Sequence, residues 1–483
     1  MWIEDVWPLS PLQEGLLFHA QYDERSRDLY VEQRTMELAA PLDVAVLRSS
    51  WEALLERHAG LRVSFRQPEG AQRLVQVVVA GVPLPWRTED LSGLPQEKAE
   101  AEAARLAEED HARRFDLAVA PWLRLLLIKL DDSRYRLVVT LHHILLDGWS
   151  MPVLFGELAQ IYAAGGDSGA LPPATPYRDY LAWLSRQDQA AAREAWRAEL
   201  AGLSEPTLVA PADTGSAPVQ PEHVAVRADS ALTAALDVAA RAHGVTLNTV
   251  VQAAWAMLVG QLTGRADVVF GTVVAGRPAD LPGVEHMLGL FINAVPVRVR
   301  LDPGQSVAGL LTNLQVRQAG LFAHQHLGLA DIQREAGAGA TFDTLVVYQN
   351  YPRPPGGGLL DEGGLRITGT GAKDAAHYPL LLGVVPGEEM EFRADYRPDL
   401  FGSADVRALL ARLLRLLAQF AADLAQPVGR LDVLEPAEWH AVLDQWQGAA
   451  VVVPSVSVPE LFAVQVARVP GGVAVVDGDV SLT

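Results

Sequence analysis

The chain has 483 residues, of which 49% are hydrophobic and 20% charged, with a formal net charge of −20 and no cysteine. This length predicts two or three hydrophobic cores, and the composition is typical of a folded protein. The negative charge disfavours nucleic acid and anionic membranes as partners, and the lack of cysteine excludes disulfides and thiol nucleophiles.

No basic segment followed by an apolar one stands at the N-terminus, so no signal peptide is predicted. No apolar run reaches the length of roughly 18 residues that a membrane span requires. We therefore expect a cytoplasmic protein.

The first half of the chain alternates predicted strands and helices. Helices are predicted where apolar residues recur at helical spacing, and strands where apolar and β-branched residues form short runs. The predicted helices are 10–19, 42–58, 96–113 and 148–163, and the predicted strands are 30–38, 61–65, 74–79, 123–130 and 135–143. A loop rich in Gly, Pro and Ala at 164–175 predicts a boundary between two halves.

The second half repeats the mixed pattern without a repeat of the sequence. The predicted helices are 232–243, 247–262, 307–322 and 403–425, and the predicted strands are 268–274, 342–349, 380–385 and 390–396. A glycine-rich loop is predicted at 352–364, a linker at 447–454, and a new helix and strand pattern from 458 to 483. We therefore expect two mixed α/β lobes, 1–172 and 173–446, followed by a separate segment, 447–483.

One motif in the first half carries candidate chemistry: HHILLDG at 142–148, which closes a predicted strand. Successive strand residues face opposite sides, so His143 can face a cavity while His142 packs inside, or the reverse. A neutral imidazole at a strand end suits general-base work near pH 7. Asp147 can pair with an arginine and fix the loop, and Gly148 leaves room for a ligand to approach the backbone.

Two other interpretations of this motif are simpler. A single histidine here would more often be a core residue before an ordinary turn, but the combination of two histidines, an aspartate and a glycine is more specific. Metal ligation is the second interpretation. We expect no metal, because no third ligand at a recognised metal-site spacing accompanies the two histidines.

Residues 142–150, HHILLDGWS, resemble the active-site motif of condensation domains of nonribosomal peptide synthetases. Other segments resemble the motifs of this family in the same order: PLSPLQEGLLFH at 8–19, RHAGLRVSF at 57–65, YRDYLAW at 177–183, LGLFINAVPVR at 288–298 and HQHLGLADI at 324–332. The segment FDTLVVYQN at 342–350 departs from the commoner form of the seventh motif. The resemblance covers about residues 2–446, and 459–483 resemble the start of an adenylation domain, as in a fragment of a larger synthetase.

The resemblance implies a fold and a reaction. The fold is α/β (an α+β sandwich), with two chloramphenicol acetyltransferase-like lobes in a V shape and the active site in a tunnel between them. Family members join two substrates that phosphopantetheine arms tether to carrier proteins: the acceptor amine attacks the donor thioester and an amide forms. The implied partners are a donor carrier, an acceptor carrier and an adjacent adenylation domain, and the domain binds no cofactor of its own.

The resemblance also assigns roles to residues. His143 matches the second histidine, acting either as the base or as a hydrogen-bond positioner of the amine, and both roles stay open. Asp147 matches the structural aspartate, with Arg277 as its ion-pair partner. His142 and Gly148 complete the catalytic motif, with His142 and Arg62 expected to support the site rather than to react, and Asn293, Trp149 and Ser150 are expected to line the substrate tunnel. The alternatives are a solvated turn residue for Arg277, a strand arginine on a solvated face for Arg62, and a turn or backbone-capping role for Asn293.

The subtype and the alternatives complete the prediction. The segments 8–19 and 142–150 resemble domains that accept a donor ending in a D-residue. A dual epimerization and condensation subtype is set aside because only His19 stands where its extra histidine motif belongs. The alternative functions are an epimerization domain, a non-catalytic recruitment module of the same fold, and a free-standing acyltransferase that uses coenzyme A.

Overall fold

The computed structural model describes residues 2–22, 28–70, 73–211, 219–351, 361–362, 364–448, 452 and 455–483. The chain divides into two compact units, Met1–Val433 and Leu434–Thr483. The first unit contains two large hydrophobic cores, each packed against a six-stranded sheet. The expectation of two mixed α/β lobes is thus met within this unit. The lobe boundary predicted at residue 172 stays a prediction.

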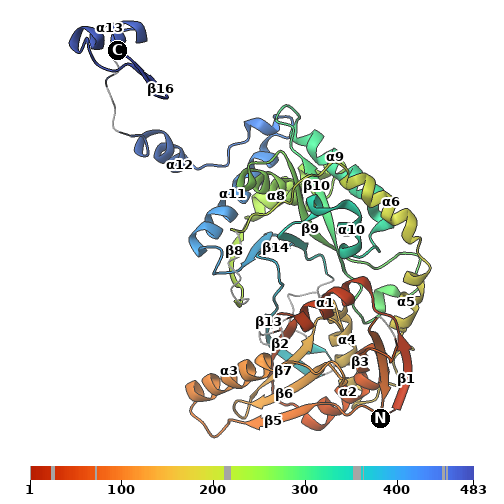
Figure 1. Cartoon of the computed structure of the whole chain (residues 1–483). Coiled ribbons are helices and arrows are strands. Elements are labelled where there is room, and N and C mark those ends of the chain that lie inside the picture. Colours follow the sequence, from red (N-terminus) through yellow and green to blue (C-terminus); the bar gives the residue numbers. More distant parts are fainter. Residues whose placement is uncertain are drawn as a thin grey trace. The chain divides into compact units, whose positions relative to one another are not determined.

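The first lobe is built on the sheet β12-β13-β2-β7-β6-β5, with a small sheet β1-β4-β3 beside it (Figure 1). Its strands are β1 (Trp2–Trp7), β2 (Val31–Ala39), β3 (Val63–Arg66), β4 (Val75–Ala80), β5 (Trp86–Asp90), β6 (Leu123–Lys129), β7 (Arg134–His142), β12 (Asp361–Glu362) and β13 (Leu365–Lys373). Its helices are α1 (Pro11–Tyr22), α2 (Val44–Arg57), α3 (Gln96–Ala112) and α4 (Ser150–Ala163).

The second lobe is built on the sheet β10-β9-β11-β14-β15-β8. Its strands are β8 (Glu222–Arg227), β9 (Asp267–Val274), β10 (Asn293–Arg300), β11 (Thr344–Tyr348), β14 (Leu380–Val385) and β15 (Glu391–Tyr396). The remaining long helices of this unit are α5 (Tyr177–Ser185), α6 (Gln189–Leu200), α7 (Ser230–Ala242), α8 (Leu247–Thr263), α9 (Val307–Leu321), α10 (Leu329–Ala336) and α11 (Ser403–Ala422).

Helix α8 shows why an apolar helix lies at the centre of a lobe. Twelve of its residues are buried, so it is covered on all sides rather than on one face. The Thr246 hydroxyl accepts from the Thr249 N–H at its start, and Gly264 ends it at φ 68°, a conformation that favours glycine. Within the described ranges no single helix is long and apolar enough to cross a bilayer; the pair α7 and α8 reaches the length only together and is bent by 103°.

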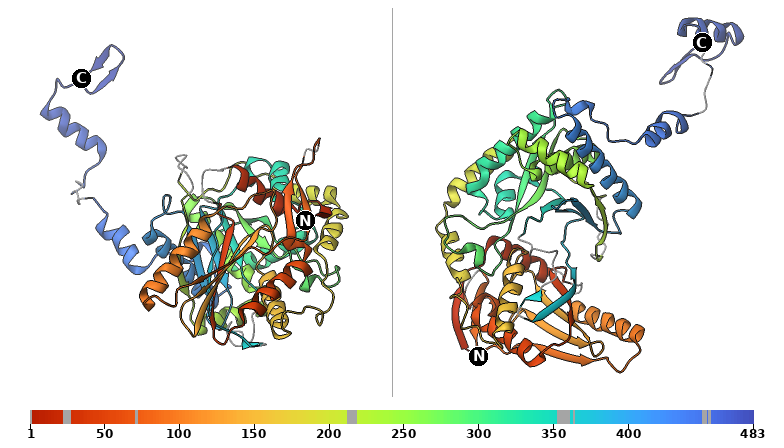
Figure 2. Two further views of the ribbon diagram at one scale, coloured as in Figure 1. Left: turned by 90° about the horizontal axis from the view of Figure 1, so that it is seen from below. Right: turned by 180° about the vertical axis from the view of Figure 1, so that it is seen from behind.

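Two segments from the second half of the sequence belong to the first lobe. Strand β13 pairs antiparallel with β2, from Ile367 opposite Leu38 to Lys373 opposite Gln33. In Figures 1 and 2 this cyan strand lies among the red and orange strands of the first lobe. The stretch 281–291 also contributes buried apolar side chains to the core of the first lobe. The residues that follow β13 therefore lie beside the start of β2.

Most predicted elements are present, and the differences have physical reasons. The helix predicted from 148 begins only at Ser150, because residues 143–149 form the turns and irregular backbone between β7 and this helix. The strands that the sequence did not predict include β1, β8 and β13: the first two are edge strands rich in charged residues, and the third carries two glycines. The loop predicted at 352–364 lies almost wholly outside the described residues.

The second unit is small. It contains α12 (Pro436–His440), α13 (Val458–Arg468) and a hairpin of β16 (Val475–Asp477) and β17 (Val480–Leu482). A capping box starts α13, because the Glu460 side chain accepts from the Ser457 backbone N–H at 2.7 Å. The helix and strand pattern predicted for 458–483 is confirmed.

Candidate active site

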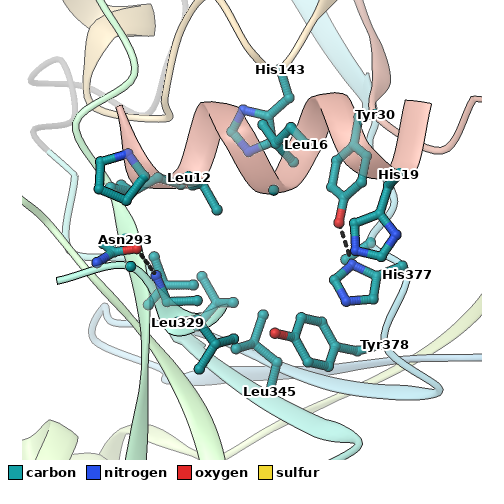
Figure 3. Close-up of a pocket in the computed structure, with 18 of the residues that line it drawn as sticks. Leu12, Leu16, His19, Tyr30, His143, Asn293, Leu329, Leu345, His377 and Tyr378 are labelled. Carbon is teal, nitrogen blue, oxygen red and sulfur yellow. Dashed lines mark hydrogen bonds between the residues drawn. The ribbon is translucent and has the colours of Figure 1, made fainter. Parts of the chain in front are cut away.

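A cavity of about 1840 Å³ lies between the two large sheets, and both lobes line it (Figure 3). Helix α1 and the ends of β2 and β7 form one wall, which includes His143 and Gly148. Strands β11, β14 and β15, helix α10 and residues 374–378 form the rest. The end of β7 thus brings the histidine motif to this cavity.

His142 packs inside the first lobe. Its side chain is fully buried, and its ring lies 4.9 Å from that of Trp122 in an edge-on arrangement. The Nδ1 atom accepts from the Ile144 N–H at 3.1 Å, so the neutral ring carries its proton on Nε2, which lies 3.2 Å from the Asp28 carboxylate. His142 therefore stabilises the turn after β7 from within the first lobe, without lining the cavity.

His143 faces the cavity. Its backbone N–H donates to the Tyr30 carbonyl at 2.8 Å, and its side chain keeps 22% exposure. The Nδ1 atom lies 2.8 Å from the Leu146 carbonyl oxygen, which can only accept, so the neutral ring carries its proton on Nδ1. The other nitrogen, Nε2, is then the one with a free lone pair. This is the protonation state that an acceptor of an amine proton requires.

The charges around His143 favour its protonated form. Burial lowers the pKa of His143, but the carboxylates of Glu32, Asp147 and Asp374 and the Leu146 carbonyl raise it, and the net pKa lies above 6.5. Glu32 is the nearest carboxylate, with Oε1 3.5 Å from Nδ1. The Arg34 guanidinium lies 3.3 Å from Glu32 and 3.9 Å from Asp374, so one positive charge pairs with both carboxylates beside the site.

Asp147 and Arg277 form the predicted ion pair, with Nη2 of Arg277 3.2 Å from Oδ1 of Asp147. Both side chains are buried, at 0% and 5% exposure. Asp147 Oδ1 also accepts from the Ser150 N–H at 2.9 Å, and Oδ2 accepts from the Phe291 N–H at 3.0 Å. The carboxylate therefore joins the turn after β7 to the segment before β10.

Arg277 is held on its other sides as well. Its guanidinium donates to the carbonyls of Val284 and Met287 and lies 3.9 Å above the Phe291 ring. The preceding residue, Gly276, has φ 60°, and a Cβ there would lie only 1.8 Å from the Phe291 carbonyl oxygen. Only glycine fits at 276, and this close approach aims Arg277 at Asp147.

The structure adds a reason for glycine at 148, which lines the cavity. A Cβ there would lie 2.5 Å from the end of the Tyr351 ring. The expected close approach of a ligand to the Gly148 backbone stays a prediction. Tyr351 lines the same cavity as His143. Burial and the charges of Asp147, Glu32 and Asp374 raise the pKa of Tyr351 to about 12.

Arg62, Ser150 and Trp149 also lie outside the cavity. The Arg62 guanidinium is buried behind the small sheet, 2.6 Å from Glu4 and bonded to the carbonyls of Leu55 and Val79. Ser150, expected along the tunnel, is instead buried in the ion-pair network, because its hydroxyl accepts from Arg277 at 3.0 Å. Trp149 also lies off the cavity.

Trp149 donates from its indole N–H to the Glu285 carbonyl at 3.3 Å, and the Arg277 guanidinium lies 5.8 Å from its ring. Asn293 does line the cavity, but its amide donates to the carbonyls of Gln325 and Leu327 at 2.9 and 2.8 Å. Asn293 therefore both caps backbone carbonyls, as the alternative expected, and lines the cavity, as the tunnel prediction expected.

Several residues near His143 escaped the sequence interpretation. Glu32 was a residue of a predicted strand, but the register that places β2 beside β7 was unknown. Asp374 follows β13 and is brought here by the pairing of β13 with β2, and Tyr351 comes from the segment that follows β11. Among the described residues, no group of three or more His, Asp or Glu side chains is arranged to hold a metal ion.

The chain is similar to known proteins in sequence and in fold. The family described as "Condensation domain" matches residues 3–443. One of the subunits of the linear gramicidin synthase of Brevibacillus parabrevis is 37% identical over 492 residues, covering 100% of this chain and 6% of the relative. Surfactin synthase subunit 3 of Bacillus subtilis (strain 168) is 33% identical over 445 residues, covering 91% of this chain and 35% of the relative. The chain thus spans about a third or less of these relatives.

Solved structures with the same fold include two that are 26% identical. The first condensation domain of the calcium-dependent antibiotic synthetase, in complex with a substrate analogue, has a TM-score of 0.72 and covers 89% of this chain and 100% of its own. The X-domain from teicoplanin biosynthesis has a TM-score of 0.75 and covers 88% and 97%. The predicted fold class, a condensation-domain α/β fold, is confirmed.

The contact between Gly148 and Tyr351 yields a test. We expect Gly148→Ala to displace the Tyr351 ring and to lower the rate of the catalysed reaction about tenfold or more. The free energy of unfolding should change little, because the clashing atoms are the movable end of a side chain. The double variant Gly148→Ala with Tyr351→Leu should regain activity relative to Gly148→Ala alone. If it does not, the backbone of Gly148 must instead be open to a ligand.

Proposed function

Since this chain belongs to the condensation-domain family of nonribosomal peptide synthetases, we propose that it forms an amide bond between two thioester-bound substrates. The donor is an aminoacyl or peptidyl thioester and the acceptor is an aminoacyl thioester, each carried on the phosphopantetheine arm of a carrier protein. The observation that carries the proposal is the His143 imidazole, turned into the cavity between the lobes with its Nδ1 proton directed at the Leu146 carbonyl.

In the proposed reaction the acceptor nitrogen attacks the donor thioester carbon. A carbon–nitrogen bond forms, the carbon–sulfur bond breaks, and the amine gives up one proton while the donor arm leaves as a thiol. The lone pair on Nε2 of His143 accepts that proton or holds the amine by a hydrogen bond along the line of attack. Holding two tethered reactants together supplies much of the rate by itself, because it replaces a bimolecular encounter.

The same proposal covers the partners and the setting. We expect an upstream donor carrier, a downstream acceptor carrier and an adjacent adenylation domain, as in a piece of a larger cytoplasmic synthetase. With a net charge of −20, the docking of acidic carriers must rest on local basic or apolar patches. The linker and beginning of an adenylation domain within 447–483, with the adenylation-like part at 459–483, and the preference for a donor ending in a D-residue stay predictions from the sequence.

Other functions of the same fold make different predictions. One solved neighbour is the X-domain from teicoplanin biosynthesis in complex with OxyB, which suggests a binding module as the alternative. His143 has a fixed tautomer and neighbouring carboxylates. These surroundings favour a catalytic role here. An epimerization domain would invert a carrier-bound residue without a second substrate.

The direct test is reconstitution of the 483-residue chain with separately loaded donor and acceptor carriers. His143→Ala should lower amide formation by about 10² to 10⁴ if His143 is the base, because that is the usual contribution of such a group. His243→Ala, on an exposed site at the end of α7, is the matched control and should leave the rate unchanged. Undiminished amide formation by His143→Ala would overturn the assignment, and inversion of a lone aminoacyl carrier would favour the epimerization alternative.

Glu32 provides a second test through pH. The negative charge of Glu32 raises the pKa of His143, so Glu32→Gln should lower that pKa and move the acid limb of kcat/KM to lower pH. The same substitution at Glu37, farther along β2 and paired with Arg136 at 2.6 Å, should leave the profile in place. An acid limb that stays in place in Glu32→Gln would show that Glu32 does not act on the titrating group.

A further inference from the structure

Strand β15 presents a charged face to the cavity. Its sequence, EFRADY, alternates charged residues with apolar or aromatic ones, and successive strand residues point to opposite sides of the sheet. Phe392, Ala394 and Tyr396 are buried in the core of the second lobe, and the charged residues between them line the cavity. These charges lie outside the histidine motif and need an explanation of their own.

Arg393 joins this charged face to the residues that follow β13. Its Nη2 lies 3.3 Å from Oδ1 of Asp374, and its Nε lies 2.7 Å from Oδ1 of Asp395. Arg393 belongs to the sheet of the second lobe, whereas Asp374 directly follows the strand that crosses to the first lobe. The guanidinium therefore connects the two lobes.

Arg34 continues the series of charges on the first lobe. Its Nη2 lies 3.9 Å from Oδ2 of Asp374 and 3.3 Å from Oε2 of Glu32, so one nitrogen faces both carboxylates. The other oxygen of Glu32, Oε1, lies 3.5 Å from Nδ1 of His143. Positive and negative groups thus alternate from Arg393 to the reactive imidazole, and we call this series the charge chain.

The two arginines of the charge chain share one carboxylate. Arg393 and Arg34 both pair with Asp374, and Arg34 also pairs with Glu32. While Arg393 neutralises Asp374, Arg34 is available to Glu32. Glu32 is buried and the other members are partly buried, where charges act on one another more strongly than in bulk water. A change at Arg393 therefore reaches the imidazole through two carboxylates.

The charged and titratable groups around His143 come from every element packed against it. They are Tyr30, Glu32 and Arg34 at β2, Asp147 in the turn after β7, Tyr351 after β11, Asp374, His377 and Tyr378 after β13, and Glu14 and His19 on α1. Burial lowers the pKa of His143, and the carboxylates of Glu32, Asp147 and Asp374 raise it, Glu32 the most. Asp147 is neutralised by Arg277, so Arg34 is the cation that divides its charge between the other two.

We propose that Arg393 is a positioning residue for the reaction: by holding Asp374 it keeps Arg34 on Glu32, and so sets the place and the effective charge of Glu32 beside the imidazole. This inference rests on the proposed function and adds to it a dependence of the reactive histidine on the second lobe. Because Arg393 belongs to β15, the spacing of the two lobes affects how readily His143 takes a proton.

The test follows the pKa of His143 in the 483-residue chain by NMR of ¹⁵N-labelled histidine, with the signal assigned by its loss in His143→Ala. Arg393→Gln should let Asp374 draw Arg34 away from Glu32 and raise that pKa by roughly 0.5, the size expected for partly exposed charges. Asp374→Asn should lower it by a similar amount, because one negative charge is lost and Arg34 pairs with Glu32 alone. The acid limb of kcat/KM should move in the same directions.

Three further variants separate the charge chain from a general effect on folding, with the free energy of unfolding measured on each. Arg393→Lys keeps the positive charge and should keep most of the native pKa. Arg227→Gln should leave the pKa unchanged, because Arg227 lies on the neighbouring strand β8 and pairs with Glu391 at 3.0 Å. In the Asp374→Asn background, Arg393→Gln should add little, because Arg393 acts through Asp374.

The outcomes distinguish this inference from the proposed function. An unchanged His143 pKa in Arg393→Gln, or the same rise in the Asp374→Asn background, overturns the inference. If Arg393→Gln does not fold, Asp374→Asn decides alone, and an unchanged or raised pKa there overturns it as well. Shifts of the predicted sign without any amide formed between loaded carriers contradict the proposed function and leave the inference standing.

Discussion

The buried ion pair of Asp147 and Arg277 is the contact on which the rest of the site depends. Asp147 ends the turn after β7, and Arg277 follows β9 in the other large sheet. Through the Phe291 N–H and the carbonyls of Val284 and Met287, the pair fixes the stretch 281–291 against the core of the first lobe. Loss of one partner from such a buried pair costs about 3–5 kcal/mol, since the other charge is left unpaired.

The position of the His143 side chain follows from the ion pair of Asp147 and Arg277. The turn held by Asp147 places the Leu146 carbonyl 2.8 Å from Nδ1 and so sets the tautomer of the imidazole. The β13 crossing then adds the parts that the turn lacks: it delivers Asp374 to the charged surroundings and His377 to the cavity. Asp374 and His377 both come from far along the sequence, and both lie near the start of β2. The turn thus positions the reactive histidine, and the chain crossing completes its surroundings.

The sequence predicted what local patterns determine. The strand that ends in His142, the alternation that turns His143 outward, and the partner for Asp147 all follow from residue order, motif spacing and family resemblance. It could not predict Glu32, Tyr351 or His377, because their places depend on strand register and on β13 joining the first sheet. Ser150 and Trp149 were expected along the tunnel because they adjoin the motif. The start of α4 turns them instead into the ion-pair network.

The central claim is that the ion pair of Asp147 and Arg277 acts as one unit that holds the His143 imidazole in position. The most direct measurement is a double-mutant cycle of Asp147→Asn and Arg277→Met, with the rate of amide formation between loaded carriers and the free energy of unfolding measured on each variant. We expect each single substitution to lower the rate at least tenfold and the double variant to be no slower than the slower single one, a coupling of about 1–3 kcal/mol. Reductions that multiply in the double variant would contradict the account.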